Sequence, residues 1–273
     1  MAAGPARARR VALQIEYDGG AYAGWQSQPL APSIQSQLQT ALARIADAPI
    51  ALVCAGRTDA GVHARAQIAH FDTTALRSAE AWVLGTNTLL PADISVRWAR
   101  PVPAHFHARY SALWRTYRYL IVNRRARSAL AAGRALRVSA PLSVEQMRAG
   151  AACLLGEHDF SAFRSAECQS RSPVRIVRAL TIERLGDWVS IDITANAFLH
   201  HMARNLVGLL LAIGAGRVPG EHARLRLASR QRDAHVVTVP PAGLYLWSVQ
   251  YPAPFGLPVD SAMMPPVPAP GPA

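Results

Sequence analysis

The most informative absence in this 273-residue chain is lysine, because all 29 of its basic residues are arginine. Without lysine the chain cannot form a Schiff base with a carbonyl substrate or anchor pyridoxal phosphate. It also lacks the lysine with which a Walker A loop binds nucleotide phosphates. These three kinds of chemistry are therefore excluded before any motif is considered.

Cysteines and long apolar segments are scarce as well. Cys54, Cys153 and Cys168 have no CxxC spacing, which disfavours a disulfide framework or a cysteine-built zinc site. No uninterrupted apolar run is long enough to cross a bilayer. Residues 1–10 contain arginine but no apolar stretch follows them, so they do not resemble a secretory signal. We therefore expect a soluble, cytoplasmic protein with no membrane partner.

Acidic residues are outnumbered, 17 against 29, and the formal net charge is +12. An excess of this size indicates a polyanionic partner. A general preference for arginine over lysine would explain the residue type but not the excess over acids. Because the planar guanidinium suits both phosphate contacts and stacking on bases, we expect RNA or DNA as the partner.

The hydrophobic pattern predicts the same order of elements in both halves of the chain. The first half has expected strands and helices at 11–18, 34–45, 50–54, 67–71, 78–90 and 94–98. The second half has them at 115–122, 143–155, 174–184, 189–193, 201–213 and 244–249, with a further short helix near 222–229. Each series is β-α-β-β-α-β, the order of a ferredoxin-like unit.

The predicted fold class is therefore α+β, with two ferredoxin-like (RRM-like) halves whose mainly antiparallel sheets join around a central basic cleft. We expect an N-terminal domain at 1–105 that carries the catalytic loop and a C-terminal domain at 106–251. Residues 252–273 are rich in proline and almost uncharged, so we expect a disordered tail there.

The segment Gly56–Ala64, Gly-Arg-Thr-Asp-Ala-Gly-Val-His-Ala, lies between two expected strands and carries three chemically active side chains. Arg57 and Asp59 are close enough in sequence to pair, and an arginine partner keeps a carboxylate ionised and oriented. The imidazole is that of His63. The alternative is that Asp59 only closes an Asx-turn, and on spacing alone this alternative is favoured.

Two segments interleave aromatic residues with arginine: Phe106–Tyr110 (Phe-His-Ala-Arg-Tyr) and Arg115–Tyr119 (Arg-Thr-Tyr-Arg-Tyr). In RNA-binding sheets this pairing supplies stacking faces and phosphate partners. The alternative is a strand whose tyrosines are core residues and whose arginines are merely solvated. We prefer that alternative for Tyr119.

Metal and dinucleotide sites are not expected. His200 and His201 are adjacent, so on a helix their side chains would point about 100° apart and could not share an ion. His105 and His107 share a strand face without a neighbouring carboxylate or cysteine. Gly214-Ala-Gly216 follows a helix rather than a strand and lacks the third glycine of a dinucleotide fingerprint.

The string at 56–64 resembles the catalytic loop of the tRNA pseudouridine synthase A family. Similarity to this family extends from about residue 11 to residue 251 and includes six further strings. These are Tyr17-Asp-Gly-Gly, Gly24-Trp-Gln, Arg115-Thr-Tyr-Arg-Tyr, Cys168-Gln-Ser-Arg, Asn196–Asn205 and Gly243–Leu246.

The resemblance implies that the protein isomerises uridine to pseudouridine at positions 38–40 of the tRNA anticodon stem-loop, by base flipping and without a cofactor. It implies Asp59 as the catalytic carboxylate, Arg57 as its partner and occupant of the vacated space, and Tyr117 as the residue that stacks on the base and serves as a candidate general base. It also suggests a homodimer in which one tRNA touches both protomers.

The expected tRNA contacts combine the resemblance with the arginine-rich and aromatic segments. They are Arg57, Arg77, Phe106, His107, Arg109, Tyr110, Tyr117, Arg125, Cys168, Gln169, Ser170 and Arg171. For His200 and Arg204 we expect structural roles, with Arg204 helping to frame the cleft.

Two other functions fit part of the pattern. A non-catalytic RNA-binding or RNA-folding protein would explain the charge and the aromatic residues, but not Arg57, Asp59 and Tyr117 together. An Asp-dependent nuclease is less favoured because no second carboxylate accompanies Asp59 to hold a metal.

Overall fold

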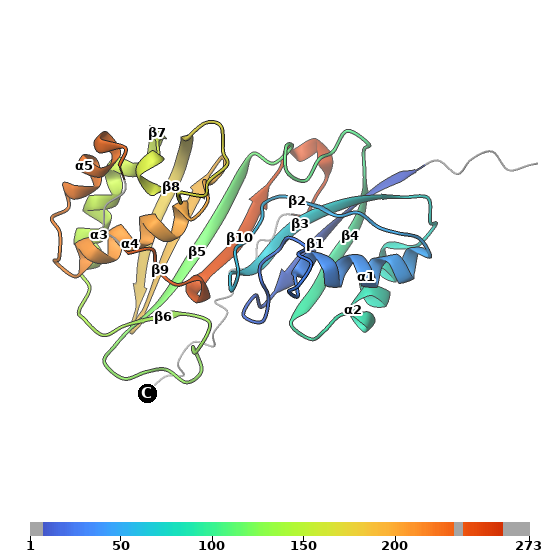
Figure 1. Ribbon diagram of the computed structural model, residues 1–273, viewed down its shortest axis with the longest axis horizontal. Helices are drawn as coiled ribbons and strands as arrows, with labels where there is room; N and C mark the ends of the chain where they lie inside the picture. Colours follow the sequence, from blue (N-terminus) through green and yellow to red (C-terminus); the bar gives the residue numbers. More distant parts are fainter. Residues whose placement is uncertain (1–7, 232–236, 259–273) are drawn as a thin grey trace, which may run out of the picture.

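The computed structural model, which describes residues 8–231 and 237–258, contains one continuous twisted sheet (Figure 1). Its strand order is β4-β1-β3-β10-β5-β9-β8-β7, with β2 paired to β3 and β6 paired to β5. The strands are β1 (Arg9–Tyr17), β2 (Val53–Cys54), β3 (His63–Thr73), β4 (Ile94–Val102), β5 (Trp114–Asn123), β6 (Leu136–Val138), β7 (Gly156–Asp159), β8 (Val174–Leu185), β9 (Trp188–Ala195) and β10 (Leu244–Gln250).

The helices cover one face of this sheet (Figure 1). They are α1 (Ile34–Ala46), α2 (Thr86–Leu89), α3 (Val144–Ala151), α4 (Met202–Gly214) and α5 (His222–Ser229). A π-helical turn (Ala81–Gly85) leads into α2, and short 3-10 turns lie at Ala152–Leu154, Ser161–Phe163, Pro241–Gly243 and Ala253–Phe255. Among the described segments, no helix has the length and apolar character needed to cross a bilayer.

The two halves have the predicted order of elements. The first is β1-α1-β2-β3-α2-β4 and the second is β5-α3-β8-β9-α4-β10, with the short strands β6 and β7 added. Their strand orders, β4-β1-β3-β2 and β10-β5-β9-β8, correspond position by position. The α+β fold class is therefore confirmed.

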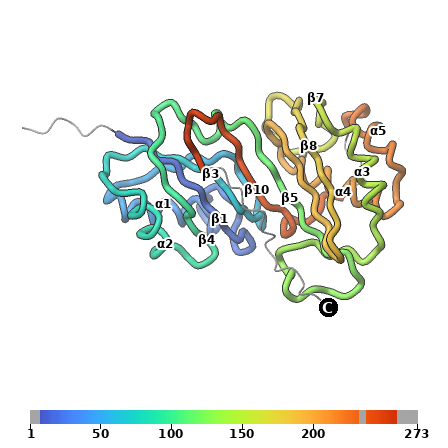
Figure 2. Tube along the Cα trace, turned by 180° about the vertical axis from the view of Figure 1, so that it is seen from behind, coloured from blue at the N-terminus to red at the C-terminus, as the bar shows by residue number. Residues whose placement is uncertain are grey.

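The seam between the halves lies where β10 inserts between β3 and β5 (Figure 2). β10 is antiparallel to β5 over most of its length, but it is parallel to β3 at only two positions, where Tyr245 pairs with His63 and Leu246 with Ala64. The short strand β2 pairs with β3 further along, at His70 and Ala69. The loop at 56–64 therefore ends directly on the seam.

Helix α4 is the most deeply buried helix, as its nearly continuous apolar sequence predicts. Leu206, Leu209 and Leu210 are fully inaccessible to solvent. The helix starts at Met202 rather than at His201, and His201 takes a left-handed conformation with φ of 63°. This one-residue shift matters for the site because it places both adjacent histidines outside the helix.

The predicted tail boundary at residue 252 is wrong by several residues. Ala253–Phe255 forms a 3-10 turn, and the Phe255 ring lies 5.1 Å from the ring of Phe106, at an edge-on angle. An aromatic side chain can extend a core even from a proline-rich segment. The prediction for 259–273 falls outside the described residues.

Candidate active site

The loop at 56–64 is fixed to its surroundings by backbone and side-chain hydrogen bonds. The hydroxyls of Tyr17 and Thr58 are 2.8 Å apart, and the backbone N–H of Trp25 donates to the Thr58 carbonyl at 3.0 Å. Gln67 Nε2 donates to the carbonyl of Gly56 at 2.6 Å. A loop held at these points presents its remaining side chains in one orientation.

Two glycines allow another segment to pack directly against this loop. Gly24 has φ of 96°, and a Cβ atom on it would lie 2.6 Å from the Thr58 carbonyl oxygen. A Cβ atom on Gly19 would lie 2.0 Å from the carbonyl oxygen of Val62. Both distances are shorter than any real contact, so only glycine fits. The Tyr17–Gly20 and Gly24–Gln26 strings therefore support the catalytic loop.

Asp59 is the acidic group at the centre of the site, and its side chain is 29% exposed. Its Oδ2 lies 3.5 Å from Nη1 of Arg204 and 3.4 Å from Nε2 of His201, and its Oδ1 lies 3.4 Å from Nε2 of His200. Arg204 is held in turn by donation from its Nε to the carbonyl of Val239 at 2.8 Å. Two histidines just before α4 and an arginine in its first turn thus face one carboxylate of the first half.

The predicted pairing of Arg57 with Asp59 is wrong. Arg57 is exposed, and the ion pairs that Asp59 makes with described residues are those with His200, His201 and Arg204. Sequence proximity suggested the neighbouring arginine, whereas the fold supplies one 145 positions away. The exposed guanidinium of Arg57 remains available to a ligand.

The prediction that His200 and His201 could not share an ion rests on a premise that the structure contradicts. It assumed that both lie on a helix, whereas both precede α4 and His201 has a left-handed backbone. Their ring centroids are only 4.0 Å apart. With Asp59 they place three ligand atoms within 4.8 Å of one another, a set that could hold a metal ion.

Tyr117, in the middle of β5, lies beside the same carboxylate. Its ring packs edge-on against Phe198 with centroids 4.8 Å apart, and its hydroxyl lies close to Gly56. Burial, and secondarily the negative charge of Asp59, raises the pKa of the Tyr117 phenol far above its usual value. The phenol is therefore protonated at neutral pH, which disfavours the predicted role as a general base.

The sequence pattern allowed Arg115 to be a phosphate-binding arginine, but its side chain is buried. It connects the segments that form the site by hydrogen bonds. Its buried guanidinium donates to the carbonyls of Ala55 (3.0 Å), Asn196 (2.7 Å), Ala112 (3.2 Å) and Arg109. The Ala55 carbonyl precedes the catalytic loop, and the Asn196 carbonyl lies before the two histidines. The Arg109 carbonyl lies in the aromatic segment at 106–110, and the Ala112 carbonyl follows it.

Tyr119 and Arg118, in the same segment Arg115–Tyr119, also have structural roles. Tyr119 is fully buried and donates its hydroxyl to the Pro240 carbonyl, so the core interpretation is confirmed. Arg118 forms a two-point ion pair with Asp192.

The segment at 106–110 divides into a buried and an exposed part. Phe106 has no exposed surface and packs against Tyr251 and Phe255, so its predicted contact with tRNA is wrong. Tyr110, in contrast, is 76% exposed. His107 stacks on Tyr110 at 4.3 Å, and the Arg109 guanidinium lies 5.6 Å from the Tyr110 ring centroid. We call His107, Arg109 and Tyr110 the aromatic platform.

His63 is a structural residue rather than a reactive one. Its imidazole is buried, and its Nε2 lies 3.1 Å from the carbonyls of both Gly133 and Ala242. Its Nδ1 lies 3.0 Å from Asp18 Oδ1, and its ring stacks on Tyr245. His63 therefore links the end of the catalytic loop to the second half.

The remaining predicted contacts fall in three places. The segment Cys168–Arg171 follows Ser165, whose N–H donates to the His200 carbonyl at 2.9 Å, so this loop starts beside the site. Cys168 and Ser170 are half-buried, whereas Gln169 and Arg171 are exposed.

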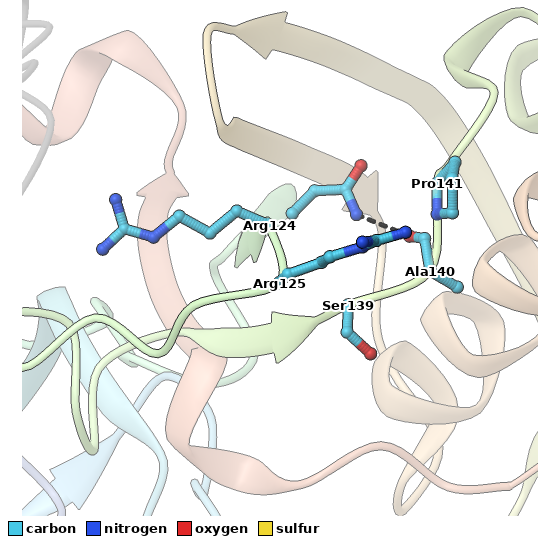
Figure 3. A pocket seen from close by; sticks show the side chains of 6 residues that line it. Arg124, Arg125, Ser139, Ala140 and Pro141 are labelled. Atoms are coloured by element: carbon cyan, nitrogen blue, oxygen red, sulfur yellow. Dashed lines mark hydrogen bonds between the residues drawn. The ribbon is translucent and has the colours of Figure 1, made fainter.

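Arg77 donates to the Ile45 carbonyl near the C-terminal end of α1, about 17 Å along the helix from Ile34, whose N–H donates to the Gly24 carbonyl beside the catalytic loop. Arg125 lines a separate pocket of about 580 Å³ with Asn123, Arg124 and residues 139–141 (Figure 3). This pocket lies at the end of β5, about 20 Å along the strand from Tyr117.

An acid surrounded by basic groups, between two RRM-like halves of a chain with a net charge of +12, is typical of an enzyme that acts on a nucleic acid. Comparison with known proteins gives the particular family. The family model described as tRNA pseudouridine synthase matches residues 13–111 and 151–252. The chain therefore belongs to the tRNA pseudouridine synthase family, as its sequence motifs predict.

Individual relatives match over nearly their full length. The chain is 54% identical to tRNA pseudouridine synthase A of Methylococcus capsulatus, over 92% of this chain and 93% of the relative. It is 51% identical to the Nitrosococcus oceani protein of the same name, over 91% and 96%. The Cronobacter sakazakii protein of that name is 50% identical over 91% and 92%.

Sequence reasoning assigned His200 and Arg204 structural roles and gave His201 none. The only signal was the family-like string Asn196–Asn205, whose polar residues interrupt an otherwise apolar segment. A polar cluster at the start of a buried helix indicates side chains directed at a partner.

The close approach of Gly24 to the catalytic loop yields a first prediction. In Gly24→Ala the left-handed backbone and the overlap with Thr58 should cost roughly 1–3 kcal/mol. We expect a lower urea midpoint and reduced pseudouridine formation. Gly133→Ala, which also has positive φ but no atom within 4 Å, isolates the backbone cost. Equal effects on activity in the two variants would refute the packing explanation.

A second prediction concerns the pH dependence of stability and His70, which supports the aromatic platform. His70 Nδ1 accepts from the Ala108 N–H, and burial lowers the pKa of His70 to about 4. Between pH 6.5 and 4 the unfolded chain therefore binds the proton that the folded chain excludes, so stability falls as pH falls. The loss should approach about 3 kcal/mol by pH 4.

His70→Gln keeps an acceptor for Ala108 and should lose most of this slope, measured by urea unfolding across the same pH range. A variant with the wild-type slope would show that another group controls acid stability.

Proposed function

We propose that the protein isomerises uridine to pseudouridine at positions 38–40 of the tRNA anticodon stem-loop, with Asp59 as the catalytic carboxylate. The observation that carries this proposal is the placement of Asp59, partly exposed, among Arg204, His200, His201 and Tyr117. Family membership supplies the reaction, and the family resemblance supplies the tRNA positions.

The reaction conserves atoms and electrons. The bond between uracil N1 and ribose C1′ breaks, the base rotates while held, and C5 bonds to C1′. The proton leaves C5, and N1 gains one, so no oxidant, reductant or group donor is needed. We expect no cofactor. Asp59 could attack C1′, add to the uracil ring or abstract a sugar proton, and each of these roles requires the carboxylate to reach the nucleotide.

The target base must leave its stack before it reaches Asp59, at a cost of a few kcal/mol. Arg57 is exposed next to the catalytic loop, so we assign it to the space that the base vacates. Tyr117 and Phe198 form an aromatic wall beside Asp59, and we assign the contact with the flipped uracil to this wall. Arg204 compensates the negative charge of Asp59 and holds it in place.

The tRNA backbone is bound outside this centre. The aromatic platform offers a stacking face and the Arg109 charge, and the loop Cys168–Arg171 offers exposed Gln169 and Arg171 beside His200. Such combinations of rings and guanidinium groups bind RNA. From the family resemblance we also propose a homodimer that shares each tRNA, acting in the cytoplasm.

Asp59→Asn tests the function directly. The variant keeps the shape of the side chain but removes the negative charge, so pseudouridine formation should fall below detection while tRNA affinity stays within about threefold. The measurement is digestion and nucleoside analysis of uridine-labelled tRNA incubated without divalent metal, with filter binding in parallel. Product from Asp59→Asn at the wild-type rate would overturn the proposal. If the wild-type protein leaves the tRNA unchanged, the result would support an RNA-folding protein. If it cuts the tRNA strand, the result would support a nuclease.

Two exposed arginines provide a matched test of the binding surface. Arg109→Gln should weaken tRNA binding and lower the slope of log affinity against log salt by about 1, because one phosphate contact is lost. Arg77→Gln removes the same charge from a side chain held on the Ile45 carbonyl near the C-terminal end of α1, and should leave the slope unchanged. Equal slopes for both variants would show that binding depends on net charge rather than on the platform.

A further inference from the structure

We propose that Asp59, His200 and His201 form an inhibitory binding site for a zinc-class divalent metal ion. The inhibitory part of this proposal rests on the proposed role of Asp59, whereas the binding part does not. The site brings together two imidazole Nε2 atoms and one carboxylate, with all three ligand atoms within 4.8 Å of one another.

The distances are better suited to a bridging ion than to hydrogen bonds. Nε2 of His200 and Nε2 of His201 each lie 3.4 Å from an oxygen of Asp59. Charge-assisted N–H···O bonds are usually about 2.7–2.9 Å long. In a tetrahedral zinc site with bonds of about 2.1 Å, neighbouring ligand atoms are separated by about 3.4 Å. Each imidazole therefore lies at this ligand spacing from one oxygen of Asp59, Oδ1 for His200 and Oδ2 for His201, and the ligand atoms of all three side chains lie within 4.8 Å of one another.

The ligand set selects the class of metal. Imidazole nitrogen suits zinc, copper, nickel and cobalt, whereas magnesium requires oxygen ligands, of which this site offers one carboxylate. Two histidines and an acid leave a fourth position open, as in zinc sites that bind water. Arg204, 3.5 Å from Asp59 Oδ2, places a positive charge nearby and limits the affinity.

Metal binding at this site would prevent catalysis for a simple reason. Both oxygens of Asp59 face the two imidazoles, so an ion between them occupies the carboxylate that must reach the nucleotide. The ion also adds positive charge beside the Arg204 guanidinium, which lies 3.5 Å from Asp59 Oδ2. Inhibition should be reversible, because a chelator removes the ion without breaking a covalent bond.

The binding test uses the purified full-length protein and Co²⁺, which reports ligand type and geometry by absorption. We expect one bound ion with visible bands of tetrahedral nitrogen and oxygen coordination, without the near-ultraviolet band of a thiolate ligand. That band would instead indicate Cys54, Cys153 or Cys168 and would overturn the proposal. Zn²⁺ should displace Co²⁺, and Mg²⁺ should not.

Variants then locate the ion. Mutation of residues that only orient the ligands of a metal ion costs about 10- to 100-fold in affinity. Loss of a ligand itself, in His200→Gln or His201→Gln, should therefore weaken Co²⁺ binding by about 100-fold. His158→Gln removes a histidine from β7 at the sheet edge and should bind Co²⁺ as wild type does. Circular dichroism confirms that each variant is folded. Equal affinity in all four proteins would refute the site.

The activity arm tests inhibition. Zn²⁺ should inhibit wild type and His158→Gln at the concentrations that displace Co²⁺, a chelator should restore activity, and Mg²⁺ should not inhibit. Full activity of the zinc-loaded enzyme would refute the inhibitory role. If Asp59→Asn retained activity, the proposed function would fail, yet the Co²⁺ spectrum would still decide the binding site.

Discussion

The contact between Asp59 and Arg204 is the interaction on which this site depends. The carboxylate belongs to a loop of the first half, and the guanidinium to the first turn of α4 in the second half. Neither half alone contains the pair, so the site exists only when the halves are joined. The joining strand is β10, which lies between β3 and β5 and begins next to the catalytic loop.

Buried polar residues hold this arrangement in place. Arg115 binds carbonyls on both sides of the seam, and His63 contacts the carbonyls of Gly133 and Ala242 from the end of the catalytic loop. A buried polar group is costly unless its hydrogen bonds are made, so each of these residues specifies one relative position of the halves. The apolar seam strands provide cohesion, and the polar contacts provide the alignment.

The order of strands and helices was predictable because hydrophobic periodicity is a local property of the chain. β6 and β7, three and four residues long, carry too short a pattern to be recognised. The partner of Asp59 was not predictable in the same way. Arg57 is two residues away, but the backbone between them directs its side chain to solvent, and Arg204 arrives only through folding.

The histidines and Phe106 show the same limit. The apolar periodicity that predicts α4 does not show where the helix begins. His201 has a left-handed backbone just before the helix, and both imidazoles therefore face one carboxylate. Both aromatic rings of the segment at 106–110 were predicted to contact tRNA, because the alternation of residues does not tell which ring Phe255 covers. Burial of Phe106 by Phe255 is a contact between segments 149 positions apart.

The most direct test of the central contact is the single-turnover rate of Arg204→Gln at saturating tRNA. With the guanidinium removed, Asp59 loses its fixed orientation, and misplacement of a reacting group costs about 100-fold in rate. We predict that loss with tRNA affinity preserved, whereas Arg97→Gln, which breaks an exposed ion pair with Glu16, should react as wild type does. A wild-type rate for Arg204→Gln would contradict the account.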